Sequence, residues 1–305
     1  LLQWQPSGKF IAHAGESLNH DQYRLKDLQQ PGATFERYQF DPVWSPSAGV
    51  NYEPWESLNM FAAISHGFSP PSLEETLMPD GLVNTDLQPE QGLMAEMGLR
   101  WRYRELLRLS ATLYGMEITD MLVTRRLAED QFMGINAGKV RHGGIEVQAI
   151  VRPLSFLSKP AVNLSIISTL AHSVNRFVEF EDQGSDYAGN HLPGIPEYNW
   201  YNMLHMELFG RYTLHLDHRT AGRQYMTDDN TLTYSGYQIS SMSISARVGQ
   251  LHKPHVTFTT GIRNLFDTHY AAMLLINAPS FGGSAPRYYY PGAPRNGYVS
   301  VKFNL

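Results

Sequence analysis

The last residues of the chain alternate strictly between apolar and polar side chains. Val299, Val301 and Phe303 fall on one face of an extended segment, and Ser300 and Lys302 fall on the other. A period of two is typical of a β-strand with one apolar and one polar face. The same alternation recurs upstream and predicts about twelve strands. They cover residues 8–19, 43–53, 57–67, 92–104, 106–123, 135–152, 160–178, 198–209, 211–224, 237–249, 255–266 and 297–305.

The segments that join these predicted strands alternate between long and short. Counting back from the C-terminus, residues 267–296 are long, 250–254 short and 225–236 long, and the alternation continues to residue 54. A soluble sandwich gives no reason for every long loop to lie at one end. Outer-membrane barrels combine tight periplasmic turns with long extracellular loops. The sequence therefore predicts an all-β, antiparallel transmembrane barrel whose C-terminus is periplasmic and whose long loops are extracellular.

Composition agrees with a barrel and argues against other classes of protein. No apolar run approaches the ~20 residues of a membrane helix, whereas a barrel strand exposes only alternate residues to lipid. The 17 tyrosines fit aromatic girdles at the two membrane interfaces. A net charge of −5, without long basic runs, argues against nucleic-acid binding. The absence of cysteine excludes disulfides and thiolate metal sites.

Six segments carry short motifs that occur together, in the same order, in one family. They are residues 61–75 (with Gly67-Phe68-Ser69-Pro70-Pro71), 84–90 (Asn-Thr-Asp-Leu-Gln-Pro-Glu), 135–146 (with Asn136-Ala137-Gly138-Lys139), 191–196 (with Leu192-Pro193-Gly194), 263–270 (with Asn264-Leu265-Phe266-Asp267) and 291–296 (with Pro291-Gly292). Together they resemble the C-terminal part of the β-barrel of TonB-dependent outer-membrane receptors of the siderophore-receptor type. Residues 1–60 carry no such motif.

The resemblance implies a 22-stranded barrel filled by an N-terminal plug. This chain supplies about twelve of those strands and no plug. A half-barrel alone would leave two unpaired strand edges in lipid, which is costly. We therefore expect residues 1–305 to be the C-terminal portion of the barrel in a longer polypeptide. Completion of the barrel by another chain is the alternative.

The resemblance also implies uptake of a ferric siderophore, driven by TonB–ExbB–ExbD through the missing N-terminal region. The siderophore supplies the hard oxygen ligands of iron, so no cofactor or protein-bound metal is expected. Beside the siderophore, the implied partner is outer-membrane lipid. The same architecture importing haem, cobalamin, copper or an oligosaccharide stays open, although residues 72–83 lack the histidine typical of haem receptors. A soluble all-β binding protein is the alternative from another class.

Candidate site residues follow from the chemistry of an anionic chelate, which needs aromatic side chains and cationic donors. In the long loops these are Arg125, Arg126, Arg287, Tyr288 and Tyr289. On the polar faces of the strands, the residues expected to face the lumen and the plug are Arg108, His215, Arg247, Arg263 and Lys302. His215 and His218, three apart on a strand, face opposite sides and cannot share a metal. The sequence contains no nucleophile elbow, P-loop or HExxH motif, so no enzymatic activity is expected.

Overall fold

The computed structural model describes most of the chain. Outside the description are residues 27–31, 33, 77–83, 129–130, 137, 158–160, 183, 250–253, 279, 281–285 and 305, and the side chains of residues 36, 74, 124–128 and 131–132.

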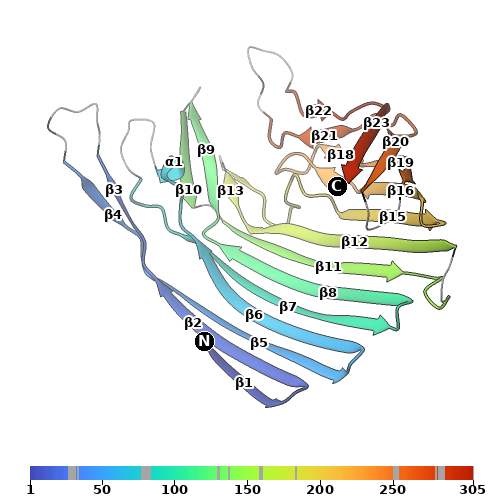
Figure 1. Cartoon of the computed structure of the whole chain (residues 1–305). Helices are drawn as coiled ribbons and strands as arrows, with labels where there is room; N and C mark the ends of the chain where they lie inside the picture. Colours follow the sequence, from blue (N-terminus) through green and yellow to red (C-terminus); the bar gives the residue numbers. More distant parts are fainter. Residues whose placement is uncertain are drawn as a thin grey trace.

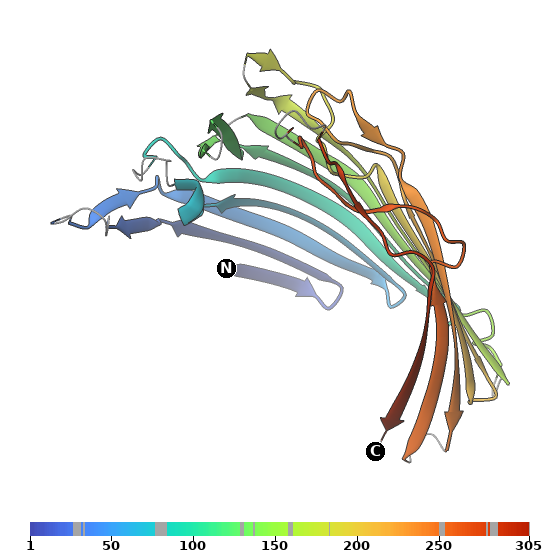
Figure 2. The ribbon, with the colours of Figure 1, turned by 90° about the horizontal axis from the view of Figure 1, so that it is seen from above.

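One antiparallel sheet of 13 strands forms most of the molecule. Its strands, in spatial order, are β1 (Leu2–Ser7), β2 (Phe10–Asn19), β5 (Val43–Trp55), β6 (Leu58–Ser69), β7 (Glu90–Tyr103), β8 (Leu107–Thr119), β11 (Lys139–Val151), β12 (Val162–Glu179), β15 (Tyr198–Leu208), β16 (Tyr212–Ala221), β19 (Tyr237–Val248), β20 (His255–Arg263) and β23 (Asn296–Asn304). The order follows the chain, and the sheet bends into an open trough (Figures 1 and 2). Among the described residues, β1 and β23 form its two edges and do not pair with each other. The predicted all-β antiparallel fold is confirmed.

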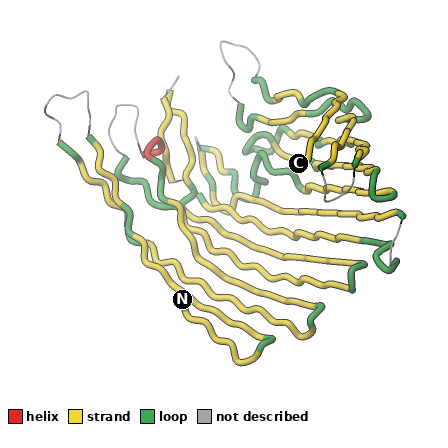
Figure 3. Tube along the Cα trace, in the orientation of Figure 1, coloured by secondary structure: helices red, strands yellow, loops and turns green. Residues whose placement is uncertain are grey.

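The long connections all rise from the same end of the sheet, as predicted, and carry small elements of their own (Figures 1 and 3). These elements are the hairpins β3 (Gln22–Leu25) with β4 (Glu36–Gln39), β9 (Leu122–Ala128) with β10 (Gln131–Asn136), β13 (Glu181–Asp182) with β14 (Ser185–Asp186), β17 (Gln224–Tyr225) with β18 (Thr233–Tyr234) and β21 (Ala271–Leu274) with β22 (Tyr289–Pro291), and the one-turn helix α1 (Leu73–Thr76). No helix in the described part of the chain is long and apolar enough to cross a membrane.

Several details of the predicted elements are wrong. The predicted strand 135–152 begins at Lys139, because residues 135 and 136 belong to β10, and the predicted strand 211–224 ends at Ala221. The N-terminal strand β1 was not expected. The predicted strand 106–123 ends at Thr119, because Asp120 adopts a φ of 56° and breaks the extended backbone. Residues 124–128 and 131–134, predicted as part of a loop, belong to the paired strands β9 and β10.

The register places the apolar positions of neighbouring strands side by side on one face, here called the outer face. Leu113 pairs with Met97 on one side and with Ile145 on the other, and their exposed fractions are 53%, 58% and 39%. Within the described residues no second sheet covers this face. Exposed apolar surface of this extent marks contact with a partner or a membrane. The opposite face, the inner face, carries Arg100, Ser110 and Gln148 at the intervening positions.

A small apolar core lies on the inner face at the long-loop end. Val140 of β11 and Phe177 of β12 are 1% and 3% exposed, and they pack with Phe180 just beyond the strand. Phe177 and Phe180 stack with their ring centroids 4.5 Å apart. Ile118 of β8 packs against this core, and side chains of the long connections complete it: Met121, Val123, Ile135, Tyr187 and Leu192. The loops are thus anchored to the sheet by side-chain packing.

Candidate functional site on the inner face and in the long loops

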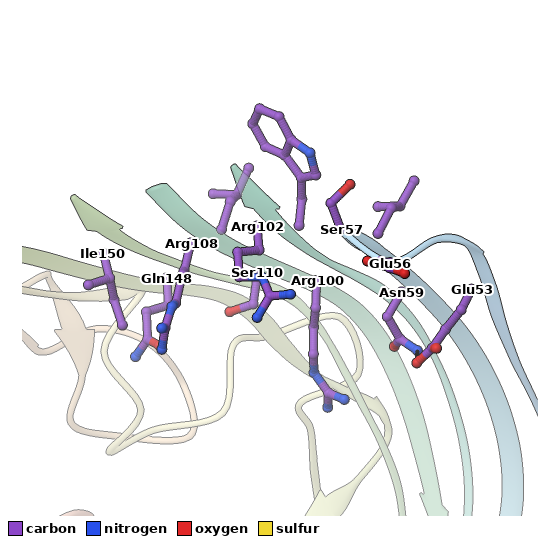
Figure 4. A pocket seen from close by; sticks show the side chains of 13 residues that line it. Glu53, Glu56, Ser57, Asn59, Arg100, Arg102, Arg108, Ser110, Gln148 and Ile150 are labelled. Carbon is purple, nitrogen blue, oxygen red and sulfur yellow. Dashed lines mark hydrogen bonds between the residues drawn. The ribbon is translucent and has the colours of Figure 1, made fainter. Parts of the chain in front are cut away.

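Three arginines gather on the inner face near the short turns. Arg100 and Arg102 of β7 and Arg108 of β8 line a depression of about 460 Å³, together with Gln148 and Glu53. We call these three arginines the inner basic patch; Figure 4 shows them on one side of the sheet. Arg102 and Arg108 stand directly opposite each other in the register. Like charges in such a pair are destabilising unless other groups compensate them.

Acidic residues of the same chain compensate only part of this charge. Arg108 donates a hydrogen bond from Nη2 to Glu105 Oε2 at 3.1 Å, and Arg152 donates to the same oxygen at 3.3 Å. The Arg100 guanidinium lies 5.1 Å from the centroid of the Phe61 ring. Within the described part of the chain, no ion pair involves Arg102. The lining of the depression thus carries these three arginines against two carboxylates, those of Glu53 and Glu56.

The remaining strand residues predicted to face the lumen also lie on the inner face, but at different heights. His215 of β16 pairs across the strands with His205, and its Nε2 lies 4.0 Å from Asp217 Oδ1. Arg263 of β20, near the long loops, holds its guanidinium 5.0 Å from the centroid of the Tyr298 ring. Lys302 of β23 stands opposite Thr257 of β20.

Arg247 makes two contacts within the chain near the short turns. It donates to the backbone carbonyl of Gly210, in the turn between β15 and β16, and to Glu207 Oε1 at 3.4 Å. Its placement therefore favours a structural role at the short-turn end.

Three long loops are joined to one another by side-chain amides; we call this the loop cluster. The Asn230 side chain accepts a hydrogen bond from the His191 backbone N–H at 2.7 Å and donates to the His191 carbonyl at 2.8 Å. Asn277 Nδ2 donates to Asp228 Oδ2 at 2.9 Å, and the Asp228 N–H donates to Asn277 Oδ1 at 3.1 Å. Asn230 and Asn277 have φ values of 57° and 47°. Asparagine tolerates this left-handed conformation better than most residues.

The electrostatics of the loop cluster follow from burial and from these partners. Burial raises the pKa of Asp228, and its hydrogen bond from Asn277 opposes that shift only in part. Burial and the charge of Arg176 lower the pKa of His191. The His191 ring stacks on the Tyr225 ring with the two centroids 4.8 Å apart. A neutral imidazole on an aromatic ring is a surface suited to an aromatic or planar ligand.

The loop residues predicted to bind a ligand fall into two separate groups. Tyr288 and Tyr289 lie beside the loop cluster, and their ring centroids are 6.4 Å apart. The ring centroids of Tyr289 and Tyr234 are 5.9 Å apart. Arg287 is exposed and precedes them. Arg125 and Arg126 belong to β9, in the hairpin above β8 and β11, and their side chains lie outside the described residues. Among the described residues, no group of His, Asp or Glu side chains has the geometry to hold a metal ion.

Sequence reasoning missed two features of this site. Arg100 and Arg102 were not singled out, although they share the polar alternation of the predicted strand 92–104. The amide links of the loop cluster join residues 39 and 49 positions apart and leave no local signal in the sequence.

Comparison with known proteins identifies the family. Residues 2–265 match a family model described as the TonB dependent receptor-like β-barrel. The chain belongs to this family. Its strands therefore lie in the outer membrane, with the outer face toward lipid, the long loops outside the cell and the short turns in the periplasm. The family comprises receptors, not enzymes.

Solved structures show the same fold at low sequence identity. The ferric-catecholate import receptor Fiu of Escherichia coli K12 matches with a TM-score of 0.69 and 19% identity, over 98% of this chain and 43% of its own. The ferric yersiniabactin receptor FyuA of Yersinia pestis gives 0.69 and 18%, over 99% and 44%. The copper transporter OprC gives 0.74 and 20%, over 98% and 46%. The chain thus spans less than half the length of these receptors.

Proposed function

We propose that residues 1–305 form the C-terminal portion of the barrel of a receptor that imports a ferric siderophore. The observation that supports this most is the loop cluster, which holds aromatic and cationic side chains at the extracellular mouth of a polar trough. His191, Tyr225, Tyr288 and Tyr289 offer ring faces, and Arg287 offers an exposed guanidinium. A ferric siderophore is bulky and often anionic, so it suits rings and charged donors better than a metal-ligating site.

The second part of the proposal concerns the inner basic patch. In the complete receptor an N-terminal plug would fill the trough, and TonB with ExbB–ExbD would act on that plug. Because Arg102 lacks an acidic partner within this part of the chain, we infer that an acidic surface of the plug faces the inner basic patch. The attraction would hold the plug at the periplasmic end until TonB displaces it.

Uptake by the complete receptor tests the proposal. A strain that lacks the native gene is complemented with the receptor, and uptake of radiolabelled iron is measured with ferric catecholates, ferric hydroxamates and ferric citrate. Copper and haem are the competing cargoes. We expect saturable uptake of one ferric chelate that disappears in a strain without TonB. Uptake of copper or haem, with none of any ferric chelate, would contradict the siderophore assignment.

Two variants test the place of binding. Arg287→Ala is expected to raise the KM for uptake about tenfold, the effect of one charged hydrogen bond. Arg211→Ala, in the turn between β15 and β16 at the periplasmic end, is the matched control. Equal effects of the two changes would show that the loop cluster is not the binding site.

A further inference from the structure

A row of sulfur- and nitrogen-bearing side chains crosses the inner face just below the apolar core, and the proposed uptake function does not use it. Met94 of β7 stands directly opposite Met116 of β8, and Met116 stands directly opposite His142 of β11. We call these three residues the methionine–histidine row, and all three are half-buried. Opposite side chains on neighbouring strands have Cβ atoms about 5 Å apart. Met116 in the middle therefore lies within reach of both of the others, and the three side chains can converge on one ion.

Asn175 of β12 orients the His142 ring. It stands opposite His142 on the side away from Met116, it is 7% exposed, and its Oδ1 lies 2.8 Å from His142 Nδ1. Asn175 Nδ2 donates to Ser173 Oγ at 2.8 Å, so Oδ1 is left to accept from His142. The neutral imidazole therefore carries its proton on Nδ1 and keeps a lone pair on Nε2, and Nε2 makes no hydrogen bond with any described residue. A histidine whose second nitrogen is fixed in this way has the arrangement that is common among metal ligands.

The two methionines interrupt a polar surface. One inner position nearer the short turns, β7 and β8 carry Glu96 and Tyr114, which stand opposite each other. In the described part of the chain, neither Met94 nor Met116 is among the side chains that pack against the apolar core above the row. Core packing therefore does not account for the two thioethers, which lie instead beside a free imidazole nitrogen.

The side chains of the row decide which kind of ion fits. Thioether sulfur and imidazole nitrogen favour copper(I), whereas carboxylate and carbonyl oxygens suit hard ions such as magnesium and calcium. The row itself contains no carboxylate, and its three side chains are neutral when His142 is unprotonated. A charge without a compensating partner is costly to remove from water, so a monovalent ion fits these neutral side chains better than a divalent one. Silver(I), which is equally soft and carries the same charge, fits for the same reason.

We propose that the methionine–histidine row binds one copper(I) ion through the two thioether sulfurs and His142 Nε2. The site lies on the wall of the lumen, directly beneath the core that anchors the long loops. Binding involves no electron transfer, because the ion enters and stays as copper(I). The proposal is independent of the imported cargo, since side chains of the sheet hold the ion and the loop cluster takes no part.

Metal binding to the purified complete receptor tests the proposal. The detergent-solubilised receptor is titrated without oxygen with copper(I), in competition with a coloured copper(I) chelator, and separately with silver(I) and zinc(II), and bound ions are counted by native mass spectrometry. The quantity compared is the difference between the wild type and each variant, so that ions bound elsewhere in the receptor cancel. We expect the double change Met94→Leu and Met116→Leu to remove one bound copper(I) or silver(I) ion and no zinc(II). Leucine has nearly the volume of methionine, so the barrel is expected to stay folded.

Two further variants locate the site. Met97→Leu is the matched control, because Met97 lies three residues along β7 on the outer face and is 58% exposed; it is expected to leave the copper(I) count unchanged. Asn175→Ala is expected to weaken copper(I) binding about tenfold or more, the usual effect of losing the partner that orients a ligating histidine. The proposal would be overturned by an unchanged copper(I) count in the double variant, by an equal loss in Met97→Leu, or by an equal loss of zinc(II). Because ions are counted and uptake is not measured, the result does not depend on whether a ferric chelate is imported.

Discussion

Replacing Gly138 with alanine tests how the start of β11 fits against the end of β12. Gly138 has a φ of +86°, and a Cβ built there would overlap the Glu179 carbonyl oxygen and lie 3.1 Å from Phe180 Cα. Both neighbours are backbone atoms, so no side-chain rotation relieves the contact. Val140 and Phe177 pack beside it in the core that anchors the loops. The backbone of Glu179 or of Gly138 would therefore have to move.

Two contributions determine how much Gly138→Ala lowers the free energy of unfolding. A left-handed conformation costs an alanine about 1–2 kcal/mol. Overpacking against atoms that cannot rotate away adds about 1–3 kcal/mol. We therefore expect Gly138→Ala to lower the free energy of unfolding by about 2–5 kcal/mol. Gly184 isolates the first term, because its φ is +80° and a Cβ there meets nothing within 4 Å. Gly184→Ala is expected to cost only about 1–2 kcal/mol.

The assay is urea unfolding of the complete receptor in lipid vesicles, followed by tryptophan fluorescence. Hydrogen exchange of residues 118–123 and 139–145 accompanies it, because the loop core can open while the transmembrane sheet stays folded. Hydrogen exchange in these segments is expected to be faster for Gly138→Ala than for Gly184→Ala. If the two variants agree within about 0.5 kcal/mol, a limit set by ordinary surface substitutions, and exchange equally, then the close backbone approach at Gly138 has no energetic role.

Three further predictions concern charged groups. Arg247→Ala removes the donor to the Gly210 carbonyl and is expected to lower stability by about 1–3 kcal/mol in the same urea assay; an unchanged midpoint would contradict this. Arg102→Glu is expected to loosen the plug of the complete receptor and to increase sensitivity to a large antibiotic, whereas unchanged sensitivity would count against plug contact at the inner basic patch. Burial raises the pKa of Asp228. The folded loop cluster therefore binds a proton at Asp228 more tightly than the unfolded chain does. Its stability consequently falls as the pH rises from the ordinary pKa of an aspartate through the raised pKa. Asp228→Asn is therefore expected to slow the exchange of backbone amide hydrogens in the loop cluster at neutral pH and to have no effect on it at acidic pH. Slowing of equal size at neutral and at acidic pH would show that burial of the charged carboxylate does not destabilise the loop cluster.

The strands of the main sheet were predictable because each one carries its own alternation of apolar and polar side chains, which can be recognised without knowing its neighbours. Period-two alternation depends only on what each face meets, and twelve of the thirteen strands of the main sheet carry it clearly. The missed strand β1 is short, contains Pro6, and shows only Leu2 and Trp4 on its apolar positions. Pro6 lies where the register with β2 shifts, between Trp4 and Ser7, and such an irregularity tolerates a residue without a backbone N–H.

The chemistry of the loops was less predictable, for a physical reason. The hydrogen bonds of Asp228 with Asn277 and of Asn230 with His191 exist only because three loops meet above the sheet. Such contacts depend on the relative heights of neighbouring strands, which no single segment encodes. Side chains on the strands carry more information: Arg141 shares its position in the alternation with Ile145 and Val147, so a charge on the apolar face was already visible in the sequence.

The arginines of this chain show why face and partner together must decide a role. Arg247 and Arg102 both lie on the inner face near the periplasmic turns, yet Arg247 uses its donors on Gly210 and Glu207, whereas Arg102 forms no ion pair in the described part of the chain. The residue type alone does not distinguish these two arginines. A guanidinium retains its charge at any accessible pH, so at a membrane protein's interior or lipid boundary it must find an anion somewhere. Where the chain supplies the anion or the carbonyl, as at Arg247, substitution should change stability; where it does not, as at Arg102, substitution should change the binding of another molecule first.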